Sequence, residues 1–344
     1  MNLSEFDYPL DKNLIAQEPI TPRDHSRLLI LDRKRKTIEH KYFYQIIDYL
    51  DKNDVLVLND SKVIPAKIAG KTENSSKEIL IVKPLEELKF FSNHWPSKWL
   101  VLGKKLKEGQ KITFSKNLEG IIIEKRGYES IIEFNQEGKN LKTNLLKLGK
   151  MPLPPYIKNP TIKSFLKYQT IYAKKLGSIA APTAGFHFTK RLLKKIQKKG
   201  VTITYITLHV GLGTFLPIKE EKIENHKMAK ECFIITKKTA SILNKAKKEG
   251  KRIIAVGTTV TRTLESATEK GILKPKIGYT DLFIYPGYKF KFIDALITNF
   301  HLPKSTPLLL VCAFASKELI LKAYQEAQKR KYRFYSFGDA MFII

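Results

Sequence analysis

The sequence predicts an α/β protein in which a small antiparallel β-barrel domain is inserted into a discontinuous, layered α/β domain with a mostly parallel sheet. In the second half of the 344-residue chain, helical segments, glycines and β-like runs alternate, which is typical of a layered α/β sheet. Between residues 69 and 150, short β-like runs follow one another without helical periodicity, which is typical of a small barrel or sandwich. We therefore predict an α/β domain over residues 1–68 and 151–344 and an inserted barrel over residues 69–150.

The first half of the chain supplies the entry into the insert, the insert and its exit. The stretch VLVLNDSKVIPAKI (55–68) belongs to the α/β pattern. Turn-like breaks then separate five runs, KEILIVKP, KWLVLG, QKITFS, GIIIEK and ESIIEF. The exit MPLPPYIKNP (151–160) is rich in proline, which predicts a stiff connector back to the α/β domain.

Helices and strands alternate in the second half, and cap residues mark where the helices begin. Threonine is a good N-cap, and glycine commonly follows the last turn of a helix. The predicted elements are a helix over 190–199 capped by Thr189, a strand over 201–210, a helix over 237–249 capped by Thr236, a strand over 252–257, a helix from Thr258 to about 270, strands over 281–287 and 292–298, a helix capped by Thr306 with Pro307 at its first position, a helix from Ser316, and a strand over 332–337.

Composition excludes several classes of protein. The N-terminus has acids where a signal peptide has cations, and the longest apolar run, 306–315, is about half a membrane span. Cys232 and Cys312 lie in apolar contexts without metal or redox spacing, so we expect core residues and a reducing, cytoplasmic location. The net charge of +29 favours a polyanionic partner, nucleic acid first and an anionic membrane surface second.

Five stretches that follow predicted strands share an unusual composition, with polar side chains set among Gly, Pro, Thr and apolar residues. Ligands of open α/β sheets bind beyond the carboxyl ends of the strands, so these stretches predict a shared site. They are LNDSKVIPA (58–66), IAAPTAGFHF (179–188), LHVGLGTF (208–215), VGTTVTR (256–262) and TNFHLPKST (298–306).

Three of these stretches carry a histidine, His187, His209 and His301. Each could be a hydrogen-bonded core residue, but three in separate loops favour a shared pocket, because imidazole transfers protons well near neutral pH. Their spacing is not that of a zinc site, so we expect no metal. The candidate carboxylates are Asp60, Asp281, Asp294 and Asp339, and a turn-forming role stays open for Asp60 and Asp339.

Two further segments suggest contacts with anions. In VGTTVTRTLES, Thr258 and Thr259 follow a glycine at a helix start, which predicts an anion-binding N-terminus or simply a well-capped helix. Arg262 and Glu265, three residues apart, could pair with each other. The helix KRLLKKIQKK has no acidic residue, so its exposed cations are expected to contact RNA phosphates, namely Lys190, Arg191, Lys194 and Lys195.

Taken together, these stretches resemble the S-adenosylmethionine:tRNA ribosyltransferase-isomerases of queuosine biosynthesis. The resemblance runs end to end, through FDYPLDKNLIAQEP, NDSKVIPAKI, MPLPPYI, GSIAAPTAGFHF, TLHVGLGTF, AVGTTVTRTLES, DALITNFHLPKSTPLLLVCAFA and YRFYSFGDAMFI. It implies an α/β domain with an inserted barrel. It also implies transfer and isomerisation of the ribosyl part of S-adenosylmethionine onto 7-aminomethyl-7-deazaguanine at the wobble position of tRNA, giving epoxyqueuosine, adenine and methionine.

The resemblance also assigns roles to residues of the matching motifs. It implies that His187, His209 and Asp60 are catalytic and accept protons. Substrate binding is assigned to Thr183, Gly185, Gly211, Gly213, Thr258, Thr259, Arg262, Asn299 and His301. The bare segment around Ala184 would leave room for the cosubstrate and a base swung out of the anticodon loop. S-adenosylmethionine is then a cosubstrate, no metal is needed, tRNA is the partner, and we expect a monomer that does not bind membranes. Two alternatives stay open, a non-catalytic RNA-binding protein and an RNA methyltransferase.

Overall fold

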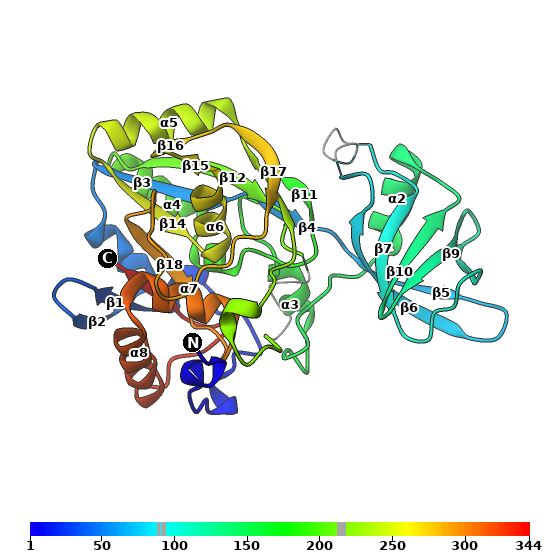
Figure 1. Cartoon of the computed structure of the whole chain (residues 1–344), viewed down its shortest axis with the longest axis horizontal. Helices are drawn as coiled ribbons and strands as arrows, with labels where there is room; N and C mark the ends of the chain where they lie inside the picture. The colour runs from blue at the N-terminus through cyan, green and yellow to red at the C-terminus, as the bar shows by residue number, and fades with distance from the viewer. Residues whose placement is uncertain (88–89, 91–93, 212–217) are drawn as a thin grey trace. The chain divides into compact units, whose positions relative to one another are not determined.

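A nine-stranded sheet and a closed six-stranded barrel organise the chain in this computed structural model, which describes residues 1–87, 90, 94–211 and 218–344 (Figure 1). The sheet belongs to a unit formed by Met1–Lys62, Pro155–Lys175 and Ala181–Ile344. The barrel belongs to a second unit formed by Val63–Pro154 and Leu176–Ala180. The predicted barrel is confirmed. The predicted domain boundaries stay a prediction, because compactness alone does not show which segment folds independently.

The sheet is mixed, so the prediction of a mostly parallel sheet is wrong. Its strand order is β17-β13-β12-β3-β14-β18-β19-β1-β2. Four neighbouring pairs are parallel, β12–β3, β3–β14, β14–β18 and β1–β19, and the other four are antiparallel. The bounds are β1 Arg27–Asp32, β2 Thr37–Tyr42, β3 Asp54–Asn59, β12 Thr202–Leu208, β13 Glu231–Ile235, β14 Arg252–Val256, β17 Lys276–Thr280, β18 Ala295–Asn299 and β19 Ala340–Ile343. A short turn after β1 returns the chain as β2, and such a turn can join only antiparallel neighbours.

Two predicted strands, 281–287 and 332–337, are not strands in the structure. The strands lie beside them, at β17 and β19. Residues 281–287 include Pro286 and Gly287, and Tyr335 has a φ of 70°, which interrupts an extended run. Tertiary pairing therefore selected the neighbouring segments as strands.

The helices of the larger unit cover both faces of the sheet, with α4 on one face and α5 and α6 on the other (Figure 1). The predicted caps Thr189 and Thr236 are confirmed, since each side chain accepts a hydrogen bond from a backbone N–H of the first turn. The predicted cap Thr306 is wrong by one residue, because Ser305 caps that helix. The bounds are α3 Ile162–Lys167, α4 Lys190–Lys198, α5 Lys237–Lys248, α6 Thr258–Ala267, α7 Thr306–Ala315 and α8 Lys317–Lys329.

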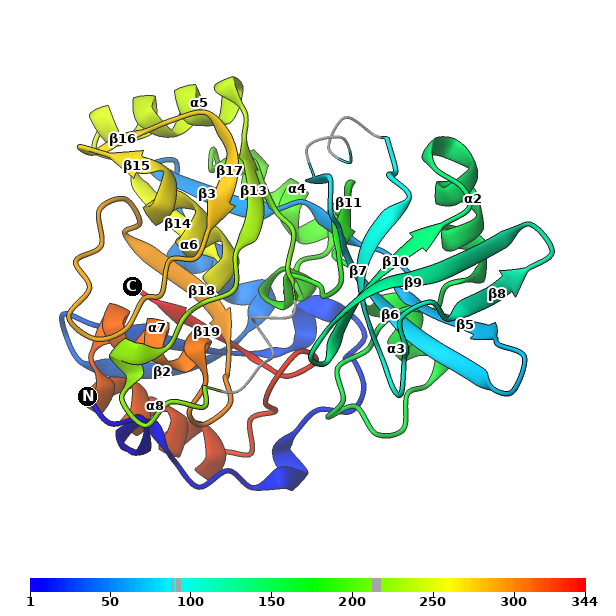
Figure 2. The same ribbon diagram turned by 45° about the vertical axis from the view of Figure 1, so that its right-hand side comes forward.

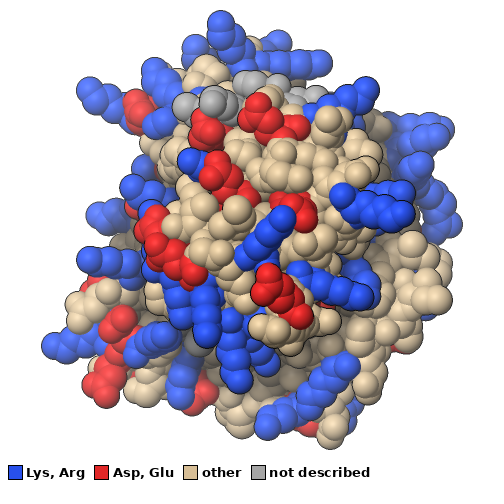
Figure 3. Space-filling model, turned by 90° about the vertical axis from the view of Figure 1, so that its right-hand side faces the viewer, with Lys and Arg blue, Asp and Glu red and all other residues tan. Residues whose placement is uncertain are grey.

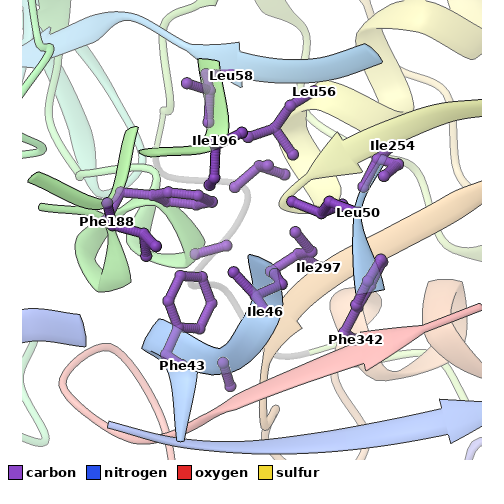
Figure 4. Packing of buried hydrophobic residues seen from close by; sticks show 14 of the residues in the cluster. Phe43, Ile46, Leu50, Leu56, Leu58, Phe188, Ile196, Ile254, Ile297 and Phe342 are labelled. Atoms are coloured by element: carbon purple, nitrogen blue, oxygen red, sulfur yellow. The ribbon is translucent and has the colours of Figure 1, made fainter. Parts of the chain in front are cut away.

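The main core lies between α4 and the sheet (Figure 4). Leu192, Leu193 and Ile196 form the buried stripe of α4, since Ile196 follows Leu192 by four residues and Leu193 by three, the spacings of one helix face. They pack with Phe43 and Phe188, two rings in edge-to-face contact at 4.9 Å between centroids. This core fixes the segment before α4, which carries several of the predicted site residues.

The barrel consists of six antiparallel strands in the closed order β10-β7-β6-β5-β8-β9 (Figure 2). Their bounds are β5 Lys67–Lys71, β6 Ser76–Pro84, β7 Lys98–Gly103, β8 Lys111–Ser115, β9 Leu118–Arg126 and β10 Glu129–Phe134. The predicted insert has no helix, but the structure contains α2, Gly138–Leu148, which buries Leu141 and Leu145. Leu141, Leu145 and Leu148 recur at the helical spacing of four and three residues, a signal that the prediction missed.

Candidate active site

A cavity lies in the larger unit, at the carboxyl ends of three parallel strands. Residues at or just after the ends of β12, β14 and β18 line it, including Val210, Thr258, Thr259, Asn299 and His301. Four of the five predicted strand-end stretches therefore contribute residues to one cavity, and the fifth, 58–66, does not line it.

One corner of the cavity is formed by the buried side chain of Asn299, which is 3% exposed. Its Oδ1 accepts a hydrogen bond from Thr183 Oγ1 at 3.1 Å. Its Nδ2 lies 3.1 Å from the Tyr335 carbonyl oxygen and 3.2 Å from His187 Nε2. The structure thus brings three predicted residues, Thr183, His187 and Asn299, into one network.

His301 lines the cavity and contacts Thr298, with 2.8 Å between His301 Nε2 and Thr298 Oγ1. Its backbone is held on both sides, since its N–H donates to the Tyr324 hydroxyl at 3.0 Å and its carbonyl accepts from the Tyr8 hydroxyl. Burial lowers the pKa of His301 to about 3, so the imidazole is neutral near pH 7.

His209 directly follows β12 and is also buried. Its Nδ1 lies 2.8 Å from Ser61 Oγ. Burial, with a smaller effect of Lys175, lowers the pKa of His209 to about 4. The ring is therefore a neutral imidazole near pH 7, and it contacts the segment that follows β3.

Asp60 follows β3 and is partly buried, and its Oδ1 accepts a hydrogen bond from Thr207 Oγ1 at 2.6 Å. Burial raises the pKa of this carboxyl group, although Thr207 and nearby lysines oppose the shift. The neighbouring Asn59 was missed by sequence reasoning. Its amide bonds both backbone groups of Leu208 at 3.0 Å, and its Nδ2 lies 3.3 Å from Thr259 Oγ1. Asn59 thus fixes the ends of two strands and the start of α6.

The start of α6 lines the cavity through Thr258 and Thr259. Gly257 precedes the helix with a φ of 93°, a conformation that strongly favours glycine. The helix N-terminus at this position has free N–H groups and a positive partial charge, which suits an anionic group of a ligand. The anion-binding role of Thr258 and Thr259 stays a prediction.

Arg262 lies one turn further along α6 and makes a buried ion pair with Glu231 of β13. Glu231 Oε1 also accepts the backbone N–H of Gly211 at 2.9 Å. The possible pair of Arg262 with Glu265 does not form, because Glu265 accepts from the backbone N–H groups of residues 291–293. Arg262 therefore connects α6 to Gly211 of the glycine-rich stretch through Glu231. The predicted substrate-binding residue Gly213 lies outside the described residues.

The segment GSIAAPTAGFHFT, which is rich in small side chains, divides into two parts. Residues 181–184 line the cavity. Gly185 instead packs inside the unit, since a Cβ atom there would lie 2.0 Å from the Tyr172 hydroxyl oxygen and 2.8 Å from Thr170 Cγ2. The small side chains before Gly185 thus leave room for a ligand, whereas Gly185 itself is required by tight packing.

An aromatic wall that the sequence did not predict borders the cavity. Tyr156 and Tyr335 stack with 4.9 Å between ring centroids and 30° between ring planes, and both line the cavity. The hydroxyl of Tyr156 contacts Ser336 Oγ. The motifs MPLPPYI and YRFYSFGD contain these residues, but nothing in either motif indicated that the two would meet.

The other candidate carboxylates, Asp281, Asp294 and Asp339, lie away from the cavity. Asp294 accepts the Ile253 N–H at 2.7 Å and pairs with Lys247. Asp339 is buried just before β19, where it accepts the backbone N–H groups of Arg27 and Arg333. Asp281 is exposed and follows β17. None of the three lines the cavity.

The basic helix α4 presents its cations to solvent. Lys190, Arg191, Lys194 and Lys195 are exposed, and Arg191 also pairs with the buried Asp24 at 3.5 Å. Basic side chains are widely spread over the molecular face in Figure 3, in keeping with 62 Lys and Arg against 33 Asp and Glu.

Within the described residues, no group of three or more His, Cys, Asp or Glu side chains could hold a metal ion. No helix in the described part of the chain is long and apolar enough to span a membrane.

Comparisons with known proteins agree with the sequence motifs over the whole chain. A family model described as a queuosine biosynthesis protein matches residues 3–343. Proteins named S-adenosylmethionine:tRNA ribosyltransferase-isomerase from Sulfurihydrogenibium sp. and Thermoanaerobacter sp. are 50% and 52% identical to this chain, with 100% of both chains covered in each comparison.

A solved structure shows the same relationship. The crystal structure of S-adenosylmethionine tRNA ribosyltransferase from Thermotoga maritima is similar with a TM-score of 0.58 and 39% identity, covering 99% of this chain and 100% of that one. The family match spans nearly every residue, and the relatives are similar over their full lengths. This chain belongs to the family of queuosine biosynthesis proteins.

Proposed function

We propose that this protein is an S-adenosylmethionine:tRNA ribosyltransferase-isomerase, as its full-length relatives are named. The observation that carries the proposal is the cavity, because the motifs shared with the family meet there at the carboxyl ends of β12, β14 and β18.

The finer reaction is the one that the resemblance implies. The ribosyl part of S-adenosylmethionine is transferred to the aminomethyl group of 7-aminomethyl-7-deazaguanine in the tRNA wobble position and is isomerised to an epoxycyclopentanediol. Adenine and methionine leave. The positive sulfonium makes the neighbouring ribose carbon acidic, so one group must accept a proton, and a second must accept one from the attacking amine.

The cavity residues divide the binding work by their chemistry. Thr258 and Thr259, at the start of α6, suit the methionine carboxylate, because a helix N-terminus favours anions. Asn299 and Thr183 offer oxygen atoms that can accept hydrogen bonds from an N–H or O–H group of the substrates. His301, which lines the cavity as a neutral imidazole, is a further contact for the cosubstrate.

The proposed proton acceptors differ in how well the geometry supports them. His209 is neutral near pH 7, as a proton acceptor must be, and burial raises the pKa of Asp60, which makes its carboxylate a better base than an exposed one. His187 has hydrogen-bond partners at both ring nitrogens, so its contacts support a positioning role instead.

The tRNA is proposed to bind through exposed cations, including Lys190, Arg191, Lys194 and Lys195 of α4. A monomeric state and a cytoplasmic location remain predictions from the sequence.

The direct test combines purified protein, S-adenosylmethionine labelled in the ribose, and tRNA that carries the aminomethyl base. Equal amounts of adenine and labelled tRNA support the proposal. Formation of the homocysteine derivative would indicate a methyltransferase, and tRNA binding without any adenine would indicate a binding protein.

A further inference from the structure

The orientation of the Asn299 amide is determined by its neighbours. The Tyr335 carbonyl oxygen can only accept a hydrogen bond, so the amide nitrogen must face it, at 3.1 Å. The amide oxygen then faces Thr183, whose hydroxyl donates to it at 3.1 Å. A flipped amide would set two oxygens against each other at Tyr335.

This orientation determines the proton position on His187. Asn299 Nδ2 can only donate, so His187 Nε2, 3.2 Å away, accepts. The ring proton is then on Nδ1, which donates to Ser26 Oγ at 2.7 Å. Burial lowers the pKa of His187 to about 3, in agreement with a neutral ring. His187 also stacks on Phe43, with 5.0 Å between ring centroids, so both its nitrogens and one ring face are occupied.

The corner therefore offers acceptors to a ligand. Both Nδ2 hydrogens of Asn299 are used, by Tyr335 and His187, while its Oδ1 retains a second lone pair. The Thr183 hydroxyl donates its only proton to Asn299 and retains its own lone pairs. Asn299, Thr183 and the stacked pair Tyr156–Tyr335 all line the same cavity.

The Tyr335 backbone supports a functional role for this corner. Tyr335 is a non-glycine residue with a φ of 70°, and such conformations persist only where the surroundings hold them. Its carbonyl accepts from Asn299 Nδ2 and from the Gly338 N–H at 2.9 Å. The turn is also closed too tightly for a side chain at Gly338, where a Cβ would lie 2.5 Å from the Arg333 carbonyl oxygen. The network thus fixes the aromatic wall and the acceptor corner together.

We propose that this corner binds a planar base that presents an N–H donor, which bonds to Asn299 Oδ1 and Thr183 Oγ1 beside the tyrosine wall. His187 is then a positioning residue that holds the Asn299 amide. The inference rests on the proposed function, which offers two such bases. One is the adenine of S-adenosylmethionine, with its amino group, and the other is the guanine-like edge of the target base in tRNA.

The test measures ligand preference, because a general loss of packing weakens the binding of all ligands alike. Titration calorimetry gives the Kd of S-adenosylmethionine and of its analogue with purine in place of adenine, which lacks the amino group. Steady-state kinetics gives the KM for tRNA. Matched variants are Thr183→Val, which removes the hydroxyl and keeps the shape, against Thr183→Ser, which keeps the hydroxyl. His187→Leu, which removes the acceptor for Asn299, is compared with His187→Gln, which can restore it.

If adenine occupies the corner, the wild type prefers S-adenosylmethionine over the analogue by about tenfold or more, as expected for a buried acceptor left unpaired. Thr183→Val and His187→Leu reduce that preference at least threefold, and Thr183→Ser and His187→Gln retain it. If the tRNA base occupies the corner, the wild type shows no preference, and the same two variants raise the KM for tRNA instead.

The proposal is overturned if the wild type shows no preference and neither variant changes the KM for tRNA by more than twofold. Thr183→Val lies on the cavity surface, so the test stands even if His187→Leu does not fold. A failure of the proposed function gives a different result, because the wild type would then release no adenine in the presence of tRNA.

Discussion

Substitution of Gly185 by alanine should destabilise the larger unit without weakening cosubstrate binding. The added Cβ would lie 2.0 Å from the Tyr172 hydroxyl oxygen and 2.8 Å from Thr170 Cγ2, both far inside van der Waals contact. Forcing extra atoms into a packed interior costs about 1–3 kcal/mol. For a unit of this size, each kcal/mol corresponds to a fall in Tm of about 2–4 °C.

The nearest clashing atom can be removed by a second substitution. The Tyr172 hydroxyl is buried and has no hydrogen-bond partner in the described part of the chain. Tyr172→Phe should therefore be neutral or slightly stabilising on its own, because it removes an unsatisfied polar group. In that background Gly185→Ala should cost less, with a coupling free energy of about 1 kcal/mol. The remaining contact with Thr170 should keep the rescue incomplete.

The assay is a double-mutant cycle followed by thermal and urea unfolding, with the Kd for S-adenosylmethionine measured for each variant. Ala184→Val is the matched control, because Ala184 lines the cavity and a larger side chain there should raise the Kd. The reasoning is refuted if Gly185→Ala unfolds like the wild type but binds S-adenosylmethionine at least tenfold more weakly. The absence of a side chain at Gly185 would then serve to make room for the ligand and not to allow tight packing.

Three other predictions concern a buried ion pair, acid stability and tRNA binding. Arg262→Met should cost about 3–5 kcal/mol because the buried Glu231 carboxylate loses the cation that pairs with it, and the double substitution with Glu231→Leu should cost less, as measured by urea unfolding. The pKa of His187 falls from 6.5 in the unfolded chain to about 3 in the folded protein, so its contribution to the free energy of unfolding is full above pH 6.5 and declines below it. At pH 5 the loss should be about 2 kcal/mol, and His187→Gln should lack this part of the loss. Replacing Lys194 and Lys195 by alanine should weaken tRNA binding and reduce its salt slope by about 2, with the Kd for S-adenosylmethionine unchanged.

Each of these predictions has an outcome that would contradict it. An Arg262→Met protein as stable as the wild type would mean that the ion pair contributes nothing. Equal loss of stability from pH 7.5 to pH 5 in the wild type and in His187→Gln would show that His187 does not titrate as described. An unchanged salt slope for the lysine variant would remove α4 from the RNA contact.

Local signals in the sequence predicted much of the fold. Threonine caps and following glycines placed α4 and α5 within a residue or two, because capping acts within one helical turn. The strands β17 and β19 were misplaced, since strand choice depends on partners distant in the chain. The mixed order of the sheet was not predictable for the same reason.

The candidate site was predicted in outline but not in its contacts. Strand-end composition led to Thr183, Thr258, Asn299 and His301, which do line one cavity. The partners of His187, by contrast, lie 161 and 112 residues away in the chain, at Ser26 and Asn299. No spacing rule connects such residues, so the sequence could indicate a polar pocket but not which groups already satisfy each other.

The most direct test of the proposed function is to incubate the purified protein with ribose-labelled S-adenosylmethionine and tRNA that carries 7-aminomethyl-7-deazaguanine, and to measure free adenine and label in the tRNA. Adenine and labelled tRNA should form in equal amounts, and neither should form with tRNA that lacks the aminomethyl group. Binding of the tRNA without any release of adenine would contradict the assignment of this chain as a ribosyltransferase-isomerase.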